Sequence, residues 1–460
     1  MADKRKHPGQ PKHKQGAKHH PAGSRQKQAA SGRKQAAREA EMRKQAAALD
    51  ENVYAIYADE DGEILDAPGM LGMGRTGREN VPLHPDDLIP LPGSADLMLL
   101  PDHEAVGMTP DGEVLPIAGL AVAAILPAGY TRLYLPAYER EDGAARLPLY
   151  GYTAVVVYHD ALYCAALYTD ENEKWDPANY NTPELPKLVK RTKKDLPGNR
   201  IVEQVGGCSL KWHCLTAQNL FYRRWECGIP ASPVCNANCF GCISLQPAEC
   251  CPSPQERIDF RPTPEEIAEV GIYHLSVAPD GIVSFGQGCE GEPTLAADNI
   301  AAGIRLIREK TKKGQINMNS NVGWTEGVRK IVDAGLDSLR VSIISAREDS
   351  YDAYYRASYH LADVKRSIRY ALDHDVYVSL NLLYFPGFND REEELSAWQD
   401  FFRELPVQMI QVRNLNIDPD AFLDIMPAPK GRAVGTKAFL ETLHAEFPQL
   451  VIGSFSHYVE

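Results

Sequence analysis

Short apolar runs separated by turn residues fill the chain from about residue 51 to residue 200. The runs cover residues 53–57, 97–100, 121–126, 132–135, 154–158 and 162–167. Turn signals lie between them, including Asp61-Gly62, Pro110-Asp111-Gly112 and Pro127-Ala128-Gly129. This pattern predicts a small β-rich domain, a sandwich or a barrel, with no catalytic motif of its own. Residues 171–200 are polar and rich in proline, which indicates a linker.

From about residue 201 the pattern changes to strands that alternate with amphipathic helices. Thr263-Pro264-Glu265-Glu266 is a capping box with proline in the first helical turn, so a helix begins there and runs toward Leu275. Further strands are predicted at 282–285, 315–319, 338–343, 376–383 and 408–412, and further helices at 296–310, 325–334, 361–374 and 391–404. Alternation at this spacing predicts βαβ units and a parallel sheet.

About six strand–helix units can be counted when the strand that leads into Cys235 is included. This number is smaller than the eight units of a closed barrel. We therefore expect an α/β domain over residues 201–460, built as an open, partial (β/α)6 barrel of the TIM type with a C-terminal extension. Its chemistry is expected at the C-terminal ends of the strands.

The first 50 residues differ from the rest of the chain in composition and charge. They hold 13 Lys and Arg against 4 Asp and Glu and few large apolar residues, whereas the whole chain has a net charge of −13. Such a segment cannot bury enough apolar surface to fold alone, so residues 1–50 are predicted to be a disordered basic tail. The tail can contact RNA, the ribosome or another acidic surface, or it can serve only as a solvated tail.

Composition also indicates the cellular compartment of the protein. No apolar run approaches the roughly 20 residues of a membrane span, and the N-terminus has no apolar signal region. We therefore expect a cytoplasmic protein without a membrane partner. Ten cysteines are too sparse for a disulfide scaffold in a chain of 460 residues. Nine of them lie from Cys208 to Cys289, which indicates metal chemistry in a reducing compartment.

The most informative motif is Cys235-Asn-Ala-Asn-Cys239-Phe-Gly-Cys242. Three thiolates on one short loop can hold three irons of a [4Fe–4S] cluster and leave the fourth iron without a protein ligand. An open iron is a place where a small molecule can bind and be reduced. A structural zinc site fits poorly, since it needs four ligands that normally come as two separated pairs.

The spacing Cys-x3-Cys-x2-Cys, with the aromatic Phe240 before the last Gly-Cys, resembles the radical S-adenosylmethionine (SAM) superfamily over residues 231–418. The resemblance implies that Cys235, Cys239 and Cys242 ligate a [4Fe–4S] cluster and that SAM binds the open iron through its amino and carboxylate groups. It also implies that one electron, from a donor such as flavodoxin or ferredoxin, cleaves SAM to methionine and a 5′-deoxyadenosyl radical that abstracts a substrate hydrogen.

Further residues at the strand ends resemble positions with which the family contacts SAM. They are Gly291, Glu292 and Pro293 after strand 282–285, Asn319 and Ser320 after strand 315–319, Ser342 on strand 338–343, and Asn381 on strand 376–383. Glycine lets backbone approach a ligand closely, and glutamate accepts a hydrogen bond from an ammonium group. Asn and Ser are also common turn residues, so their order along the chain supports the interpretation more than any single match. Arg413 can face the substrate or the SAM carboxylate.

Several cysteines depart from the family pattern. Cys289 stands just before Gly291, so it can be a catalytic hydrogen donor or a small buried residue. The remaining cysteines are candidates for a second metal centre, although their spacing fits no known pattern. They are Cys208, Cys214, Cys227, Cys250 and Cys251.

These observations favour a radical SAM enzyme, whether an oxidoreductase, a lyase or a transferase. The basic tail and the additional N-terminal domain favour a macromolecular substrate, RNA or protein, ahead of a small metabolite. The alternative function is a non-catalytic, metal-stabilised protein that docks an acidic partner through its basic tail.

Overall fold

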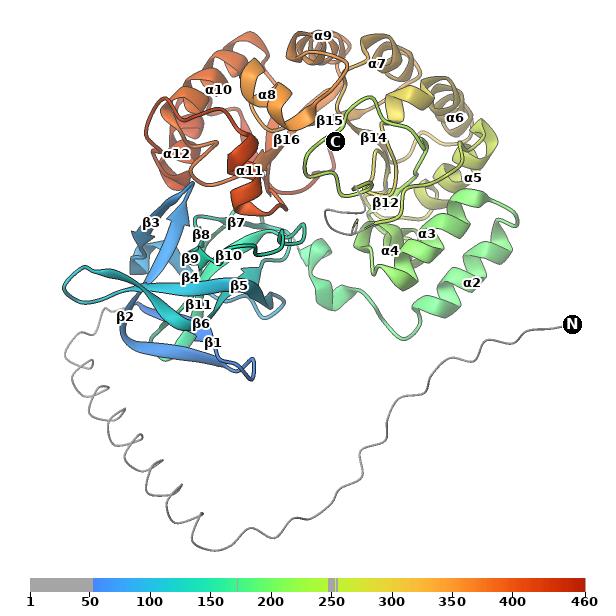
Figure 1. The fold of residues 1–460 in the computed structure, drawn as a ribbon. Coiled ribbons are helices and arrows are strands. Elements are labelled where there is room, and N and C mark those ends of the chain that lie inside the picture. Colours follow the sequence, from blue (N-terminus) through green and yellow to red (C-terminus); the bar gives the residue numbers. More distant parts are fainter. Residues whose placement is uncertain (1–52, 172, 247–252, 254, 460) are drawn as a thin grey trace, which may run out of the picture. The chain divides into compact units, whose positions relative to one another are not determined.

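The computed structural model of the chain describes residues 53–171, 173–246, 253 and 255–459. The predicted basic tail of residues 1–50 lies outside the described residues, and so do Cys250 and Cys251. Within the described part, the strands form two sheets, one of 11 antiparallel strands and one of seven parallel strands (Figure 1). No helix in this part is long and apolar enough to cross a membrane.

The first sheet contains the predicted apolar runs. Its strands are β1 (Tyr54–Ala58), β2 (Ile64–Thr76), β3 (Glu79–Pro82), β4 (Leu88–Pro90), β5 (Asp96–Met108), β6 (Val114–Ile125), β7 (Tyr130–Arg132), β8 (Leu135–Pro136), β9 (Tyr138–Arg140), β10 (Tyr152–Tyr158) and β11 (Ala161–Tyr168). The main path through the sheet is β3-β2-β5-β6-β1-β10-β11-β4. Strands β5 and β6 meet at a turn in which Gly112 has a φ of +92°, a conformation that glycine adopts without steric cost. The prediction of a sheet-rich N-terminal region is confirmed.

The segment 171–200, predicted as a linker, contains a regular helix, α2 (Leu185–Asp195). Leu185, Val189 and Thr192 are buried and recur at spacings of four and three, so they form one face of this helix. The prediction missed the helix because its buried face has only three positions among mostly polar residues. Helices α3 (Arg200–Lys211) and α4 (Leu215–Tyr222) follow before the second sheet begins.

The second sheet consists of parallel strands whose order in space is their order in the chain. They are β12 (Glu226–Gly228), β13 (Ile282–Phe285), β14 (Gln315–Ser320), β15 (Ser338–Ile343), β16 (Tyr377–Tyr384), β17 (Met409–Asn414) and β18 (Val451–Gly453). Six of them correspond to the predicted strands, and β18 was not predicted because only three residues form it. The α/β fold with a parallel sheet is therefore confirmed.

Helices connect each neighbouring pair of parallel strands. They are α5 (Pro264–Leu275), α6 (Ala297–Lys310), α7 (Thr325–Val332), α8 (Glu348–Tyr355), α9 (Leu361–Leu372), α10 (Glu392–Glu404), α11 (Pro419–Ile425) and α12 (Thr436–Glu446). Helix α5 begins at the predicted capping box, in which Thr263 accepts a hydrogen bond from the Glu266 amide and Glu266 accepts one from the Thr263 amide. In Figure 1, α5, α6, α7, α9 and α10 follow one another along the outer side of the parallel strands.

Strand β7 of the first sheet is bonded to the end of β17. The side chain of Asn414 accepts a hydrogen bond from the Arg132 amide at 3.0 Å and donates one to the Tyr130 carbonyl at 2.9 Å. The guanidinium of Arg132 is fully buried and donates to the carbonyl oxygens of Leu415 at 2.9 Å and Tyr384 at 3.3 Å. These bonds hold the β-rich region against the C-terminal ends of β16 and β17, where the predicted chemistry lies.

Candidate active site

The three-cysteine loop follows β12 and is held by the end of helix α8. The last carbonyl groups of a helix lack partners within the helix, and here two of them serve the loop. The Tyr354 carbonyl accepts a hydrogen bond from the Phe240 amide at 3.0 Å, and the Tyr355 carbonyl accepts one from the Asn238 amide at 2.9 Å. A side chain at Gly241 would place its Cβ 2.9 Å from the Tyr354 hydroxyl, so glycine is needed for this close approach.

Phe240, the aromatic residue of the cysteine motif, lies between two positive charges. The guanidinium groups of Arg146 and Arg356 each lie 4.9 Å from the centre of its ring. Arg146 comes from the β-rich region and Arg356 ends helix α8. The ring therefore joins the cysteine loop to both parts of the fold through cation–π contacts.

The three cysteines are partly buried thiols. Burial raises the pKa of Cys235 to about 11 and that of Cys239 well above its ordinary value. Within the described residues, only Glu348, Asp352 and His360 bring three potential metal donors within 4.8 Å of one another. The cysteine sulfurs are thus spread more widely than the donors of one tetrahedral zinc ion, which lie roughly 3.8 Å apart. This donor set fits a multi-iron cluster better than a single ion.

Arg257 adds a positive charge beside the loop. Its guanidinium donates to the Ser244 hydroxyl at 2.8 Å and to the Cys242 sulfur at 3.6 Å. Sequence reasoning did not single out Arg257, because it lies 15 residues after Cys242 and belongs to no motif.

The predicted Gly291-Glu292-Pro293 motif packs directly against the segment that leads to Cys235. The Gly291 amide donates to the Ser232 carbonyl at 2.7 Å, and the Glu292 amide donates to the Val234 carbonyl at 2.8 Å. A Cβ at Gly291 would lie 2.1 Å from the Val234 oxygen, so only glycine fits. Pro293 is buried and begins a short 3-10 turn.

The Glu292 carboxylate is buried and held by several donors. It accepts hydrogen bonds from the Ser320 hydroxyl at 2.6 Å, the Asn321 amide at 2.9 Å, and the amide and hydroxyl of Thr294 at 3.0 and 2.7 Å. Asn321 also donates from its side chain to Asn236 within the cysteine loop at 2.8 Å. The structure therefore brings Glu292 and Ser320, both predicted to serve SAM, together beside the cysteines.

Glu290 is a site residue that sequence reasoning treated only as an interruption of the family glycines. Its buried carboxylate accepts four backbone N–H groups, from Gly286 at 2.5 Å, Gln287 at 3.1 Å, Ala231 at 2.8 Å and Ser232 at 3.0 Å. Burial raises its pKa to about 7, although the four backbone hydrogen bonds act in the opposite direction. Glu290 thus joins the loop after β13 to the residues that precede the cysteines.

A cavity of about 520 Å³ opens at the C-terminal ends of the parallel strands. Its size is typical of a small-molecule site. Its walls include six residues singled out from the sequence: Cys239, Cys242, Asn319, Ser342, Asn381 and Arg413. Other predicted site residues are not among those that line it: Cys235, Phe240, Gly291, Glu292, Pro293 and Ser320.

Three buried polar atoms in the cavity wall have no hydrogen-bond partner within the described part of the chain. They are Gln287 Nε2, the Tyr355 hydroxyl oxygen and Asn381 Oδ1. Asn381 stands opposite Ser342 across β15 and β16, and its amide donates to the Ser342 hydroxyl at 3.5 Å. A buried polar atom without a partner costs about 1–3 kcal/mol, so these three atoms indicate a polar ligand in the cavity.

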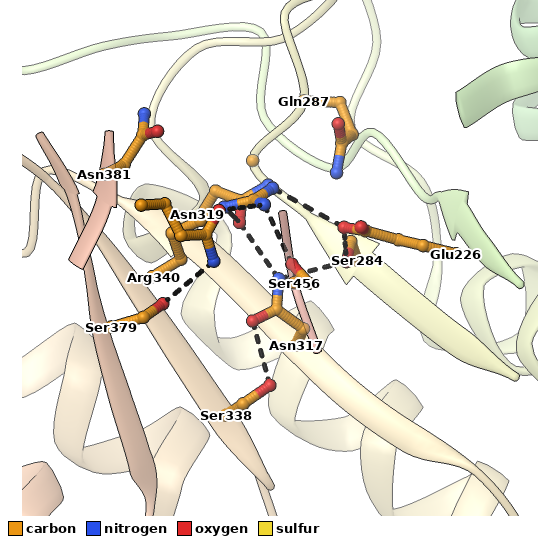
Figure 2. A network of polar contacts seen from close by, with 12 residues as sticks. Glu226, Ser284, Gln287, Asn317, Asn319, Ser338, Arg340, Ser379, Asn381 and Ser456 are labelled. Atoms are coloured by element: carbon orange, nitrogen blue, oxygen red, sulfur yellow. Dashed lines mark hydrogen bonds and ion pairs between the residues drawn. The ribbon is translucent and has the colours of Figure 1, made fainter. Parts of the chain in front are cut away.

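A polar network joins side chains of neighbouring parallel strands (Figure 2), and two of its members, Asn319 and Arg340, line the cavity. At its centre, Arg340 donates to Asn319 at 2.6 Å, to Ser456 at 2.8 Å and to Gln411 at 3.0 Å, and pairs with Glu226 at 3.5 Å. The Asn319 oxygen also accepts from Asn317 at 2.9 Å. These bonds orient the Asn319 carboxamide, whereas Gln287 and Asn381 stand outside the network in Figure 2.

Cys289, predicted as a catalytic residue, is not part of the cavity wall. It is buried at 6% exposure and its thiol is hydrogen-bonded to Cys208 on α3, an interaction that raises the pKa of Cys289. This burial favours the alternative of a small packed residue, and the catalytic role of Cys289 stays a prediction. Among the described cysteines, no three of Cys208, Cys214, Cys227 and Cys289 have sulfurs that all lie within 4.8 Å of one another.

A loop of three cysteines beside a polar cavity, at the C-terminal edge of a parallel sheet, defines the site of a metal-cofactor enzyme. Residues 229–398 match the family model of the radical SAM superfamily. The chain therefore contains a radical SAM domain, and enzymes of this superfamily use a [4Fe–4S] cluster and SAM. The resemblance inferred from the cysteine motif is thus confirmed.

Solved structures resemble the chain only in part. HydG, a maturase of the [FeFe]-hydrogenase, is 16% identical with a TM-score of 0.33, over 60% of this chain and 63% of HydG. Methylornithine synthase (PylB) is 16% identical with a TM-score of 0.36, over 60% and 72% of the two chains. SuiB from Streptococcus suis, bound to the precursor peptide SuiA, is 11% identical with a TM-score of 0.36, over 56% and 54%. The chain thus spans just under two thirds of HydG, and these low scores assign no substrate. No curated protein matches the chain.

Proposed function

We propose that this enzyme binds a [4Fe–4S] cluster through Cys235, Cys239 and Cys242 and cleaves SAM in order to abstract a hydrogen atom from a substrate in the adjacent cavity. The observation that carries the proposal is that two of the three cysteines share one cavity wall with three unpartnered polar atoms. When bound, the cluster supplies the electron for SAM cleavage, and SAM supplies the radical that abstracts hydrogen.

The side chains of this chain have distinct roles in the proposal. Binding of the cluster would offset the cost of deprotonating Cys235 and Cys239, whose thiol forms are favoured by burial. Glu292 and Ser320 hold the strand ends beside the cysteine loop. Asn381, together with Gln287 and Tyr355, offers the polar atoms that a bound SAM or substrate would satisfy.

The finer features of the fold follow from the same proposal. The parallel strands act as an open partial barrel of the (β/α)6 type, extended by β18, with the reaction at its C-terminal mouth. Asn319 and Ser342 face SAM from the ends of β14 and β15. The N-terminal β-rich region covers the mouth.

The electron donor is proposed to be a flavodoxin or a ferredoxin, and the location is proposed to be cytoplasmic. Support comes from the chemistry of the site, since a cluster with an open iron needs a low-potential donor and a reducing compartment.

For the substrate, the composition of the tail supports a macromolecule, RNA or protein. The 13 Lys and Arg of residues 1–50 give this segment a strong positive charge, which favours association with polyanions. A small metabolite is the second candidate, supported by a cavity of about 520 Å³.

Anaerobic SAM cleavage by the iron- and sulfide-reconstituted chain, with dithionite as reductant, tests the proposal. About four irons per chain, together with 5′-deoxyadenosine, are expected. Cys239→Ala should abolish 5′-deoxyadenosine formation, whereas Cys164→Ala, on β11 in the other sheet, should retain it. Bound zinc together with uncleaved SAM would contradict the proposal. That result would favour the alternative function, a non-catalytic binding protein, which the family match does not support.

A further inference from the structure

Arg413 is a charged residue of the cavity without a partner. It lies near the end of β17, its side chain lines the cavity, and it is partly buried. Within the described part of the chain, its guanidinium makes no hydrogen bond or ion pair. Burial lowers its pKa to about 10, which is the expected effect on a cation removed from water.

The other charged groups of the cavity wall are already satisfied. Arg340 donates to Asn319, Gln411 and Ser456 and pairs with Glu226. Glu290 accepts its four backbone amides. Among the charged side chains that line the cavity, Arg413 is therefore the one with unused hydrogen-bonding capacity, five N–H donors on a rigid fork.

The acidic residues near Arg413 are bonded to other groups. Glu226 and Asp170 act on Arg413 electrostatically without bonding to it. Glu226 accepts from the Ser284 hydroxyl at 2.5 Å and pairs with Arg340. Asp170 accepts from the Ser454 amide at 2.7 Å and contacts the His457 ring at 2.9 Å. Within residues 53–459 as far as the structure describes them, the positive charge thus has no counter-ion at bonding distance.

Arg413 adjoins a residue that is bonded to the β-rich region. The charges that act on it most are those of Arg340, Glu226 and Asp170, whereas the guanidinium that acts on Cys235 is that of Arg257. The next residue, Asn414, is bonded to β7 of the β-rich region, and residues 126–130 of that region line the same cavity as Arg413. Arg413 and the β-rich region therefore contribute to one cavity wall.

We infer that Arg413 binds an oxyanion of the substrate, a carboxylate or a phosphate, on the side of the cavity next to the β-rich region. Guanidinium binds both groups through paired N–H donors, and the burial of Arg413 strengthens the interaction. The inference rests on the proposed function, because it assigns one group of that enzyme's substrate. The substrate is accordingly an anionic molecule whose charged end lies against the wall formed by residues 126–130.

The test measures anion binding to the reconstituted full-length chain by calorimetric titration at constant ionic strength. Inorganic phosphate and acetate are the two probes. The probe that binds with the higher affinity identifies the kind of oxyanion. Arg413→Gln should weaken binding of that probe at least tenfold, and Arg413→Lys should weaken it less because the charge remains. The control Arg305→Gln, an exposed residue on α6, should bind as the wild type does.

Three results would overturn the inference. The first is that neither probe binds the wild type, and the second is that Arg413→Gln binds the probe as tightly as the wild type. The third is a loss of SAM affinity in Arg413→Gln equal to its loss of probe affinity, which would assign the guanidinium to the SAM carboxylate. Iron content and 5′-deoxyadenosine are measured on the same samples. Failure of the proposed chemistry is therefore seen separately from failure of anion binding.

Discussion

At the scale of single residues, Glu290 couples the cysteine loop to the strand end after β13. Its pKa is raised by burial to about 7, above its ordinary value of 4.5. Between about pH 4.5 and 7 the folded state therefore keeps a proton that the unfolded chain has lost. Its contribution to stability is thus largest at low pH and declines as the pH rises through that window, by about 3 kcal/mol in total.

Glu290→Gln should remove this decline, because an amide does not titrate. The free energy of unfolding, measured in denaturant at pH 5 and pH 8, should differ less in the variant than in the wild type. Glu394 offers a matched control, since it is a buried carboxyl whose pKa is also raised by burial to about 7. Glu394→Gln should flatten the pH dependence as well, but only Glu290→Gln should lower the iron content. Equal iron in the two variants would refute a role of Glu290 in holding the cysteine loop.

Arg257 is expected to tune the cluster through its contact with the Cys242 sulfur. Hydrogen bonds to ligand sulfurs stabilise the more negative, reduced cluster. A hydrogen bond to a charged group contributes about 1.5 kcal/mol, equivalent to about 60 mV for one electron. A redox titration followed by electron paramagnetic resonance should therefore place the potential of Arg257→Gln about 60 mV below that of the wild type. A potential indistinguishable from that of Arg305→Gln would exclude this effect.

At the scale of elements, the motif after β13 depends on the absence of a side chain at Gly291. Gly291→Ala would place a Cβ 2.1 Å from the Val234 carbonyl and push the segment that carries Cys235 away. We expect a lower melting temperature and less than half of the wild-type iron. Gly207→Ala, in helix α3 with no atom within 4 Å of the new Cβ, should be neutral or stabilising by about 1 kcal/mol. Full iron loading in Gly291→Ala would show that the loop tolerates the displacement.

The elements differ in how well the sequence predicted them. The capping box at Thr263 and the strand 282–285 were predicted at their observed bounds, because a cap residue and a short, mostly apolar run are local signals. Strand β18 was missed, since three residues carry no periodic signal and pairing with β17 decides their structure. The helix within 171–200 was missed because its buried face has only three positions.

At the scale of the whole molecule, the chemical class could be predicted and the construction of the cavity could not. The cysteine spacing is local information, and it identified the superfamily. The hydrogen bonds of Asn414 to Tyr130 and Arg132 join residues more than 280 positions apart. No sequence pattern in either segment predicts these bonds. The lack of a partner for Arg413 is likewise visible only when every neighbouring charge is placed.

The tail of residues 1–50 gives the last prediction, on the substrate class. If the substrate is RNA, the 13 basic residues should bind its phosphates and release counter-ions, so that affinity falls steeply as salt rises. Removal of residues 1–50 should then weaken RNA binding and reduce the salt slope, as measured by fluorescence anisotropy with a labelled RNA at several salt concentrations. Formation of 5′-deoxyadenosine in the absence of substrate should persist, because the cysteine loop and the cavity lie within residues 126–454. Binding that is unchanged and insensitive to salt after the deletion would contradict an RNA substrate and favour a small anionic metabolite, which needs Arg413 but no basic tail.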